Sequence, residues 1–390
     1  MNVNQVYALV NDINKQMYGA DAVDVQDAKG LIALGNTIMS GTVDAFFKVL
    51  IDRIGKVIVR KLDLELEFPK LMLNDYDWGC AIQKLSCDPF EATENSTWTI
   101  SDNGFTPTLL DGQDPVIHAT YFTGAISWEI KKRFPTEETL FTAFTSPQDF
   151  GAFAEVVTQA WIDSMTISVN NTARLAINNF IAEKIKNANG VINIADMYNA
   201  IATTPVTSAK DALANKDFLA YSTKIIRTYL KYIAMPNTNY NVDGRVRATQ
   251  RDNLHFFALT EWIASLDLMQ AGTWHTEYTD IYNYQEVGYW QGNKDASGIN
   301  DLDTLSAIQI TPSSEKGELS PTDVKQKGII AVMADRQAIF TGINKRRSSA
   351  FYNPIDDYTI MKAEATIQYC NDLSENGLVF IAEPTPNPGP

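Results

Sequence analysis

SPQDFGAFAEVVTQAWIDSMTISVNNTARLAINNFIAEKIKNANG, residues 146–190, has the longest helical pattern in this chain of 390 residues. Ser146, Pro147 and Asp149 fit an N-cap, a first helical position and a capping box. Gly190 follows the last apolar residues as a stop signal. At 1.5 Å per residue, about forty residues predict a rod of roughly 60 Å. Because ordinary globular helices are much shorter, we expect this helix to lie along a large body.

Two weaker helical patterns lie near the N-terminus. Residues 4–17 place apolar side chains at helical spacing. A second segment, about 25–47, contains Gly30, Gly35 and Gly41, each of which weakens a helix by roughly 1 kcal/mol relative to Ala. We therefore expect the second segment to be pliable, an arm more than a core element.

Between the arm and the long helix, the pattern changes to strand and turn. FKVLIDRIGKVIVR (47–60) ends the arm, and Gly55 permits the change from helical to extended backbone at Val57. A ribbon is expected from there to about Arg133, with HATYFTGAISWEI (118–130) as its returning strand. An exposed hairpin of this length lacks the partner surface for stability of its own, so it requires a neighbour. One face of its first strand is apolar, at Leu62, Leu64, Leu66 and Phe68.

The C-terminal half mixes helices and strands, which makes the fold class α+β. One amphipathic helix is expected over 208–235, followed by a buried strand at NLHFFAL (253–259) and a helix at TEWIASLDLMQAG (260–272). Residues 272–321 are polar and aromatic, with few regular signals. Three or four strands then follow, in GIIAVMADRQAIFTGI (328–343), YTIMKAEATIQYC (358–370) and GLVFIA (377–382), before a proline-rich tail.

The composition is that of an acidic globular protein. There are 47 Asp and Glu against 32 Lys and Arg, a formal net charge of -15, which disfavours sequence-reading nucleic-acid binding. Three cysteines without a CxxC pair indicate a reducing compartment. The N-terminus does not resemble a signal peptide, and no apolar run reaches membrane-span length, so we expect a protein made in the cytoplasm without a membrane partner.

Signatures of catalysis, metal binding and cofactor binding are absent from the sequence. The chain has no GxSxG, P-loop or GxGxxG motif, and His118, His255 and His275 lack the spacing of metal ligands. We therefore expect no catalytic residue, no cofactor and no metal.

The aromatic tract GTWHTEYTDIYNYQEVGYWQGN (272–293) leaves an alternative open. Trp274, Tyr278 and Trp290 could stack on a sugar, with Glu277 or Glu286 as acid and base of a carbohydrate-active enzyme. Spacing by four along the tract instead suits a buried helical face, and aromatic residues are also favoured in subunit interfaces. We favour core or interface.

Basic residues gather in KKR (131–133), GRVRATQR (244–251) and NKRR (344–347). Contact with phosphate is one interpretation. A solvated face, or a bridge to an acidic neighbouring subunit, fits the acidic total better.

The order of these parts resembles the fold shared by the major capsid proteins of tailed bacteriophages and herpesviruses. Individual stretches look closer to the coat proteins of small short-tailed phages, the podoviruses with protein-primed replication. The stretches that carry the likeness are LIDRIGKVIVR (50–60), SPQDFGAFAEVVTQA (146–160), LHFFALTEWIASLDL (254–268), IIAVMADRQAIF (329–340) and YNPIDDYTIMKAEATIQYCNDLSENGLVFIA (352–382).

The resemblance implies a division into named parts. These are an N-terminal arm (1–56), an E-loop ribbon (57–133), a peripheral domain with a spine helix (134–192), an axial domain (193–328), C-terminal strands that return to the axial and peripheral sheets (329–383) and a proline-rich tail (384–390).

The resemblance also implies a structural function and not an enzymatic one. Copies of the chain would form pentamers and hexamers of an icosahedral or prolate head around double-stranded DNA, in the virion. Portal, scaffolding and decoration proteins would be further partners, and DNA would be held non-specifically. An encapsulin-like non-viral shell protein is the alternative within the same fold.

Eight residues are predicted to contact neighbouring subunits in such a shell. Asp52 and Arg53 would bridge to the next subunit where the arm leaves its own. The other candidates are Leu64, Leu66 and Phe68 on the ribbon, and Arg245, Arg247 and Arg251 in a loop near the capsomer axis.

Overall fold

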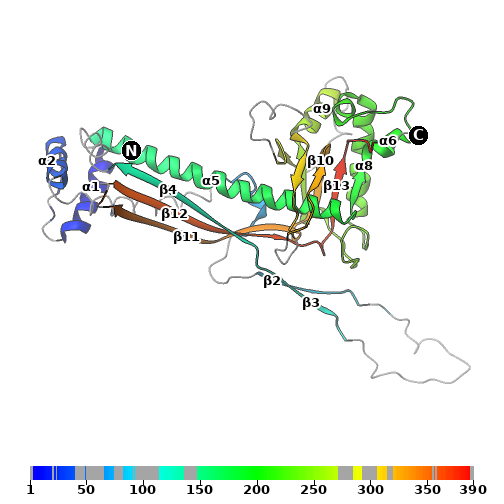
Figure 1. Cartoon of the computed structure of the whole chain (residues 1–390), viewed down its shortest axis with the longest axis horizontal. Coiled ribbons are helices and arrows are strands. Elements are labelled where there is room, and N and C mark those ends of the chain that lie inside the picture. Colours follow the sequence, from blue (N-terminus) through cyan, green and yellow to red (C-terminus); the bar gives the residue numbers. More distant parts are fainter. Residues whose placement is uncertain are drawn as a thin grey trace, which may run out of the picture. The chain divides into compact units, whose positions relative to one another are not determined.

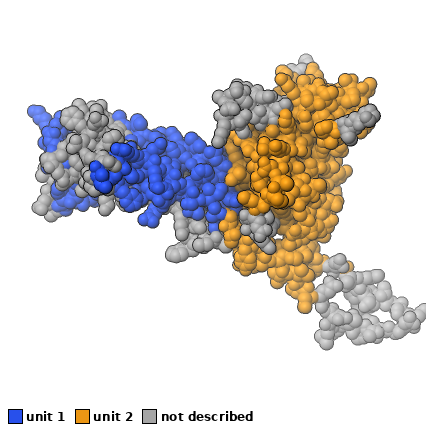
Figure 2. Space-filling view, in the orientation of Figure 1, with its two compact units in different colours: residues 1–79, 125–173, 341–369 blue, residues 80–124, 174–340, 370–390 orange. Residues whose placement is uncertain are grey.

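The chain divides into two compact units in its computed structural model (Figures 1 and 2). Unit 1 comprises residues 1–79, 125–173 and 341–369, and unit 2 comprises residues 80–124, 174–340 and 370–390. The structure describes residues 3–19, 22, 24–39, 49, 66–73, 82–90, 92, 114–135, 147–270, 284–291, 305–313, 319–353, 355 and 358–386.

The long helix α5 runs from Pro147 to Lys186 and has residues in both units. Its forty residues confirm the predicted length and start. Gly190, four residues after its end, has a φ of +68°, a backbone conformation that glycine adopts without steric cost. The local pattern thus determines where this helix begins and where the chain leaves it.

Unit 1 contains a four-stranded sheet with the strand order β1-β11-β12-β4. Figure 1 labels three of these strands, β4, β11 and β12. β12 and β4 pair antiparallel, from Tyr358 opposite Pro135 to Gln368 opposite Ala125. Every second residue of β12 from Met361 to Ile367 is buried, as expected for a strand with one face on the core. The strands are β1 (Met72–Leu73), β4 (Ala125–Pro135), β11 (Ile339–Asn353) and β12 (Tyr358–Asn371).

The helices of unit 1 share one hydrophobic core with this sheet. α1 (Val3–Tyr18) and α2 (Ala28–Met39) bury apolar side chains against Trp161 of α5 and the inner face of β12. The expectation that the segment 25–47 is not a core element is therefore wrong for α2, whose Leu31 and Ile38 are buried. Leu31 and Ile38 lie seven positions apart, so they share one helical face, and burial of that face outweighs the weak helix propensity of glycine.

Unit 2 contains a five-stranded sheet with the order β5-β13-β10-β6-β7. β10 lies between β6 and β13 and is antiparallel to both. Its residues are buried along its whole length, which explains its continuous apolar sequence. The strands are β5 (Val191–Asn193), β6 (Leu254–Leu259), β7 (Gln285–Val287), β10 (Ile329–Asp335) and β13 (Gly377–Ile381). A further pair consists of β8 (Ile308–Ile310) and β9 (Val324–Gln326).

Helices cover this sheet and complete the core of unit 2. They are α6 (Ile194–Asn199), α7 (Ala209–Ala214), α8 (Lys216–Tyr232) and α9 (Thr260–Gln270), with the short 3-10 helix η5 at Arg251–Asn253. The single helix predicted over 208–235 is wrong, because Asn215 has extended backbone and separates α7 from α8. Its side chain accepts hydrogen bonds from the N–H groups of Asp217 and Phe218, so it caps α8.

A two-stranded ribbon also belongs to unit 2. It consists of β2 (Ile82–Cys87) and β3 (Ile117–Phe122), paired antiparallel. The returning strand predicted at 118–130 is wrong as a single strand, because β3 ends at Phe122 and β4 begins at Ala125. The two strands join different sheets, since β4 pairs with β12.

Candidate subunit-contact surface

The ribbon has two faces of different character. Its register runs from Ile82 opposite Phe122 to Cys87 opposite Ile117. Because side chains alternate along a strand, exposure alternates too, and residues of the two strands share faces. We call Ile82, Lys84, Ser86, His118, Thr120 and Phe122 the inner face, and Gln83, Leu85, Cys87, Ile117, Ala119 and Tyr121 the outer face.

Apolar packing fixes one end of the inner face to the rest of unit 2. Phe122 is buried and meets the ring of Phe340 edge to face, with 5.7 Å between ring centroids. Cys370 and Ile82 complete this small cluster. Burial raises the pKa of the Cys370 thiol, so it remains a protonated apolar side chain.

Ion pairs fix the middle of the inner face. Nζ of Lys84 lies 2.5 Å from Oδ2 of Asp372 and 2.8 Å from Oε1 of Glu375. The same Glu375 oxygen lies 3.3 Å from Nε of Arg247. Oδ1 of Asp372 accepts hydrogen bonds from the backbone N–H and the hydroxyl of Ser374. Each buried charge therefore has an opposite charge or a polar partner, the condition under which buried ions are tolerated.

The far end of the inner face continues this charge pattern. Nε2 of His118 lies 2.9 Å from Oδ2 of Asp88. That hydrogen bond, together with the positive charges of His118, Arg245 and Arg247, lowers the pKa of the Asp88 carboxyl. Nη2 of Arg245 pairs with Asp243 at 2.9 Å. Pairs of opposite charge along the inner face thus hold the ribbon to the rest of unit 2.

Two predicted contact residues, Arg245 and Arg247, belong to these charge pairs. Their partners, Asp243 and Glu375, are acids of the same chain. Arg251 is exposed at the start of η5. The role of these arginines toward a neighbouring subunit stays a prediction.

The predicted ribbon residues are placed differently from the expectation. Phe68 is buried and Leu66 packs on the core of unit 1. Residues 66–68 form no strand, because Pro69 starts the 3-10 helix η3 (Pro69–Leu71) there and proline provides no ladder donor. Leu64, Asp52 and Arg53 lie outside the described residues.

The outer face carries the apolar surface that the sequence reasoning missed. Leu85, Ile117 and Tyr121 are 64%, 65% and 57% exposed. The sequence contains a signal for this face in IQKLSC (82–87) and IHATYF (117–122). In each segment every second residue is exposed, so a period of two predicts an outward-facing row of side chains. This apolar exposure makes the outer face a candidate interaction site.

The aromatic tract forms no sugar-binding platform in its described part. Trp290 is buried, its Nε1 donates to the carbonyl of Ile329 at 2.8 Å, and its own carbonyl accepts from Asn178 at 2.9 Å. A ring enclosed in this way cannot stack on a sugar. Glu286 is exposed in β7, and Trp274, Glu277 and Tyr278 lie outside the described residues.

Among the described residues there is neither a cluster of metal ligands nor a helix suited to cross a membrane. No three His, Cys, Asp or Glu side chains in them come together as a metal site requires. Of the helices within them, α5 included, none is both long and apolar enough to cross a membrane.

Similarity to known structures shows the fold of this protein. A chain in a capsid structure of Staphylococcus phage Andhra is 12% identical, with a TM-score of 0.51, over 81% of this chain and 83% of that chain. A chain in a structure of the head fiber and inner core protein gp22 of native bacteriophage P68 is also 12% identical, with a TM-score of 0.52, over 82% and 85%. The mixed helix and sheet fold is thus that of phage capsid chains.

The family follows from the sequence. The model of the Phi29-like phage major capsid protein matches residues 8–381, and the chain belongs to this family. No curated protein matches the chain. It is a structural protein of the phage head, located in the virion, and it assembles with copies of itself; the alternatives of an encapsulin and of a carbohydrate-active enzyme are set aside.

Proposed function

We propose that this chain builds the phage head by packing the outer face of its ribbon onto a second copy. The observation that supports the proposal is the exposure of Leu85, Ile117 and Tyr121 on one face of a two-stranded ribbon. The inner face is already occupied by Phe340, Asp372 and Glu375 of the same chain. Of the two faces that β2 and β3 present in the described residues, the outer one therefore remains available for another subunit.

Burial of this face contributes to assembly by the hydrophobic effect. Fully covering one large apolar side chain contributes roughly 1.5–3 kcal/mol. Contacts of this size are modest singly, but a closed shell repeats them at every subunit. The capsomers in this proposal are pentamers and hexamers, in which the ribbon corresponds to the E-loop.

The remaining partners follow from charge and from the role of a shell. A chain with a formal net charge of -15 has weak overall attraction for phosphate. We infer that double-stranded DNA is enclosed non-specifically, in an icosahedral or prolate head. Portal, scaffolding and decoration proteins are the proposed protein partners, and the narrower likeness to short-tailed phages stays a prediction.

The test places charges on the outer face. Leu85→Lys together with Ile117→Lys should abolish shells, measured by sedimentation and negative-stain microscopy beside the wild type. The unfolding free energy of the unassembled chain should change by less than about 0.5 kcal/mol per exposed site. Shells at wild-type yield would overturn the proposal.

A matched control separates the face from the added charge. Leu268 of α9 and Ile201 are 79% and 70% exposed, and Leu268→Lys together with Ile201→Lys introduces the same two charges elsewhere in unit 2. This variant should still assemble. An equal loss of shells would show that charge alone, and not the outer face, controls assembly.

A further inference from the structure

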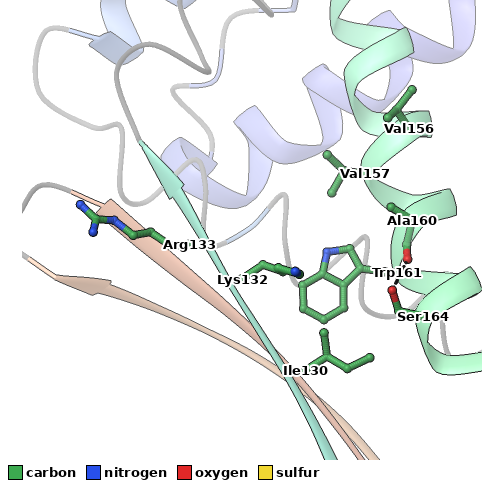
Figure 3. A pocket seen from close by; sticks show the side chains of 8 residues that line it. All are labelled: Ile130, Lys132, Arg133, Val156, Val157, Ala160, Trp161 and Ser164. Atoms are coloured by element: carbon green, nitrogen blue, oxygen red, sulfur yellow. Dashed lines mark hydrogen bonds between the residues drawn. The ribbon is translucent and has the colours of Figure 1, made fainter. Parts of the chain in front are cut away.

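Unit 1 contains a groove between β4 and α5. Its volume is about 260 Å³. Figure 3 shows its lining residues, with Ile130 and Lys132 on β4 and Val156, Val157, Ala160 and Trp161 on α5. Trp161 is buried, whereas Val156 is 68% exposed. The groove therefore has a buried aromatic floor and an open apolar rim.

The groove also has a positively charged residue, Lys132, in its lining. Lys132 is exposed and has no acidic partner among the residues that the structure describes. Its neighbours differ, because Lys131 forms an ion pair with Glu129 and the guanidinium of Arg133 lies 3.9 Å from the ring centroid of Tyr358. An occupant that matches this groove combines an apolar ring with a carboxylate.

The far end of the ribbon presents that combination. The chain leaves β2 in Asp88-Pro89-Phe90 and enters β3 from Asp114-Pro115-Val116. The N–H of Asp88 donates to the carbonyl of Val116 at 3.3 Å, so the ladder continues beyond Cys87 and Ile117. Extending this register places Phe90 across from Asp114. Phe90 is 73% exposed, and Asp114 is exposed as well.

We propose that Phe90 of one copy inserts into the β4–α5 groove of a second copy, with Asp114 beside Lys132. This inference rests on the proposed function, assembly through the ribbon. A cavity of about 150 Å³ is known to hold benzene, so the groove has room for a phenyl ring. We call the exposed Phe90 side chain the knob. Pro89 and Pro115 restrict the backbone around it, which reduces the conformational entropy lost on binding.

A contact of this kind suits a shell. The knob and the groove are different surfaces of the chain, so the contact is heterologous, and such contacts generate rings when the rotation closes. Phe90 and Val156 are both exposed in the single chain. Their apolar surface is therefore available to a neighbouring copy.

A disulfide between copies tests the placement. Phe90→Cys with Val156→Cys is made in a Cys87→Ser background, because Cys87 is exposed whereas Cys370 is buried. The shells that this variant forms, at a lower yield because the Phe90 ring is lost, should give cross-linked oligomers on a non-reducing gel after oxidation. Phe90→Cys with Leu268→Cys should give no cross-linked oligomers. The third native cysteine, Cys80, remains in all these variants, so Phe90→Cys alone is a control for disulfides between the introduced cysteine and Cys80. Shells without the cross-link, or a disulfide within one chain, would overturn the inference.

A charge exchange tests the polar half of the contact. Asp114→Lys and Lys132→Glu should each reduce shell yield at least several-fold, and the double variant should restore it. Failure of the double variant to recover would contradict the inference. Phe90→Ala separates the two proposals. A wild-type shell yield from this variant would overturn only the insertion of Phe90 into the groove. Shells from the Leu85→Lys, Ile117→Lys variant would instead overturn the proposal that the outer face of the ribbon mediates assembly.

Discussion

Lys84 and Asp372, 288 positions apart in the chain, form an ion pair of 2.5 Å on the inner face of the ribbon. The Asp372 side chain is completely buried and that of Lys84 is 14% exposed. Replacing Lys84 by Met keeps the aliphatic stem but removes the cation paired with the buried Asp372, whereas Glu375 keeps Arg247 at 3.3 Å. Breaking a buried pair by removing one partner typically costs about 3–5 kcal/mol. We expect Lys84→Met to lower the unfolding free energy by that amount in chemical denaturation of the unassembled chain.

Lys131→Met is the matched control for this prediction. Lys131 pairs with Glu129 at an exposed site, where an ion pair contributes about 0–1 kcal/mol. The two lysines therefore differ in burial and not in chemistry. Equal, small effects of both substitutions would contradict the view that the ribbon is held by buried charge.

The sequence determines the long helix and much of unit 2 because their signals are local. The start at Pro147, the strand β6 and the helix α9 all follow from spacing and capping. The break between α7 and α8 at Asn215 is not predictable from the apolar spacing, because a capping residue inside an amphipathic pattern leaves that spacing unchanged. The division of 118–130 between two strands depends on pairing with β12, which no local pattern contains.

The candidate surface was less predictable for the same reason. Arg245 and Arg247 stand out as a basic cluster, but their acids are known only from the folded chain, since Glu375 is far away in sequence. Leu66 and Phe68 have the alternating spacing of a strand. In the folded chain, however, Leu66 packs against the core of unit 1 and Phe68 is buried. Leu85 and Ile117 emerge as one face only when the β2–β3 register is known.

Gly190 gives a second prediction about stability. A Cβ atom there would lie 2.2 Å from the carbonyl oxygen of Gly377, in addition to the strain of a φ of +68°. Left-handed backbone costs a non-glycine residue roughly 1–2 kcal/mol, and the forced displacement of a packed backbone adds about 1–3 kcal/mol. We expect Gly190→Ala to lower the free energy of unfolding by the sum of these two costs, as measured by equilibrium denaturation.

Gly244 separates the two contributions to this loss. Its φ is +66°, but nothing lies within 4 Å of a Cβ atom built there. Gly244→Ala should therefore show the backbone strain alone. If the two substitutions destabilise the chain equally, close packing against Gly377 has no part in the effect.

Lys184, on the last turn of α5, is a buried lysine whose charge opposes folding. Its Nζ donates to the carbonyl of Tyr240 at 2.7 Å and to Oδ1 of Asn189 at 3.2 Å. Desolvation lowers the pKa of Lys184 to about 7, although the charge of Asp372 acts in the opposite direction. A neutral amine still has two N–H groups, which suffice for these two acceptors.

The pH dependence of stability follows from this lowered pKa. Between about pH 7 and pH 10.5 the unfolded lysine holds a proton that the folded one has released, so the unfolding free energy rises with pH. The slope contributed by this one group approaches about 1.4 kcal/mol per pH unit. Lys184→Met should remove that slope in denaturant titrations at pH 7, 8 and 9, whereas Lys186→Met, on an exposed side chain of the same turn, should retain it. Parallel curves for the wild type and Lys184→Met would show that Lys184 is charged in the folded chain.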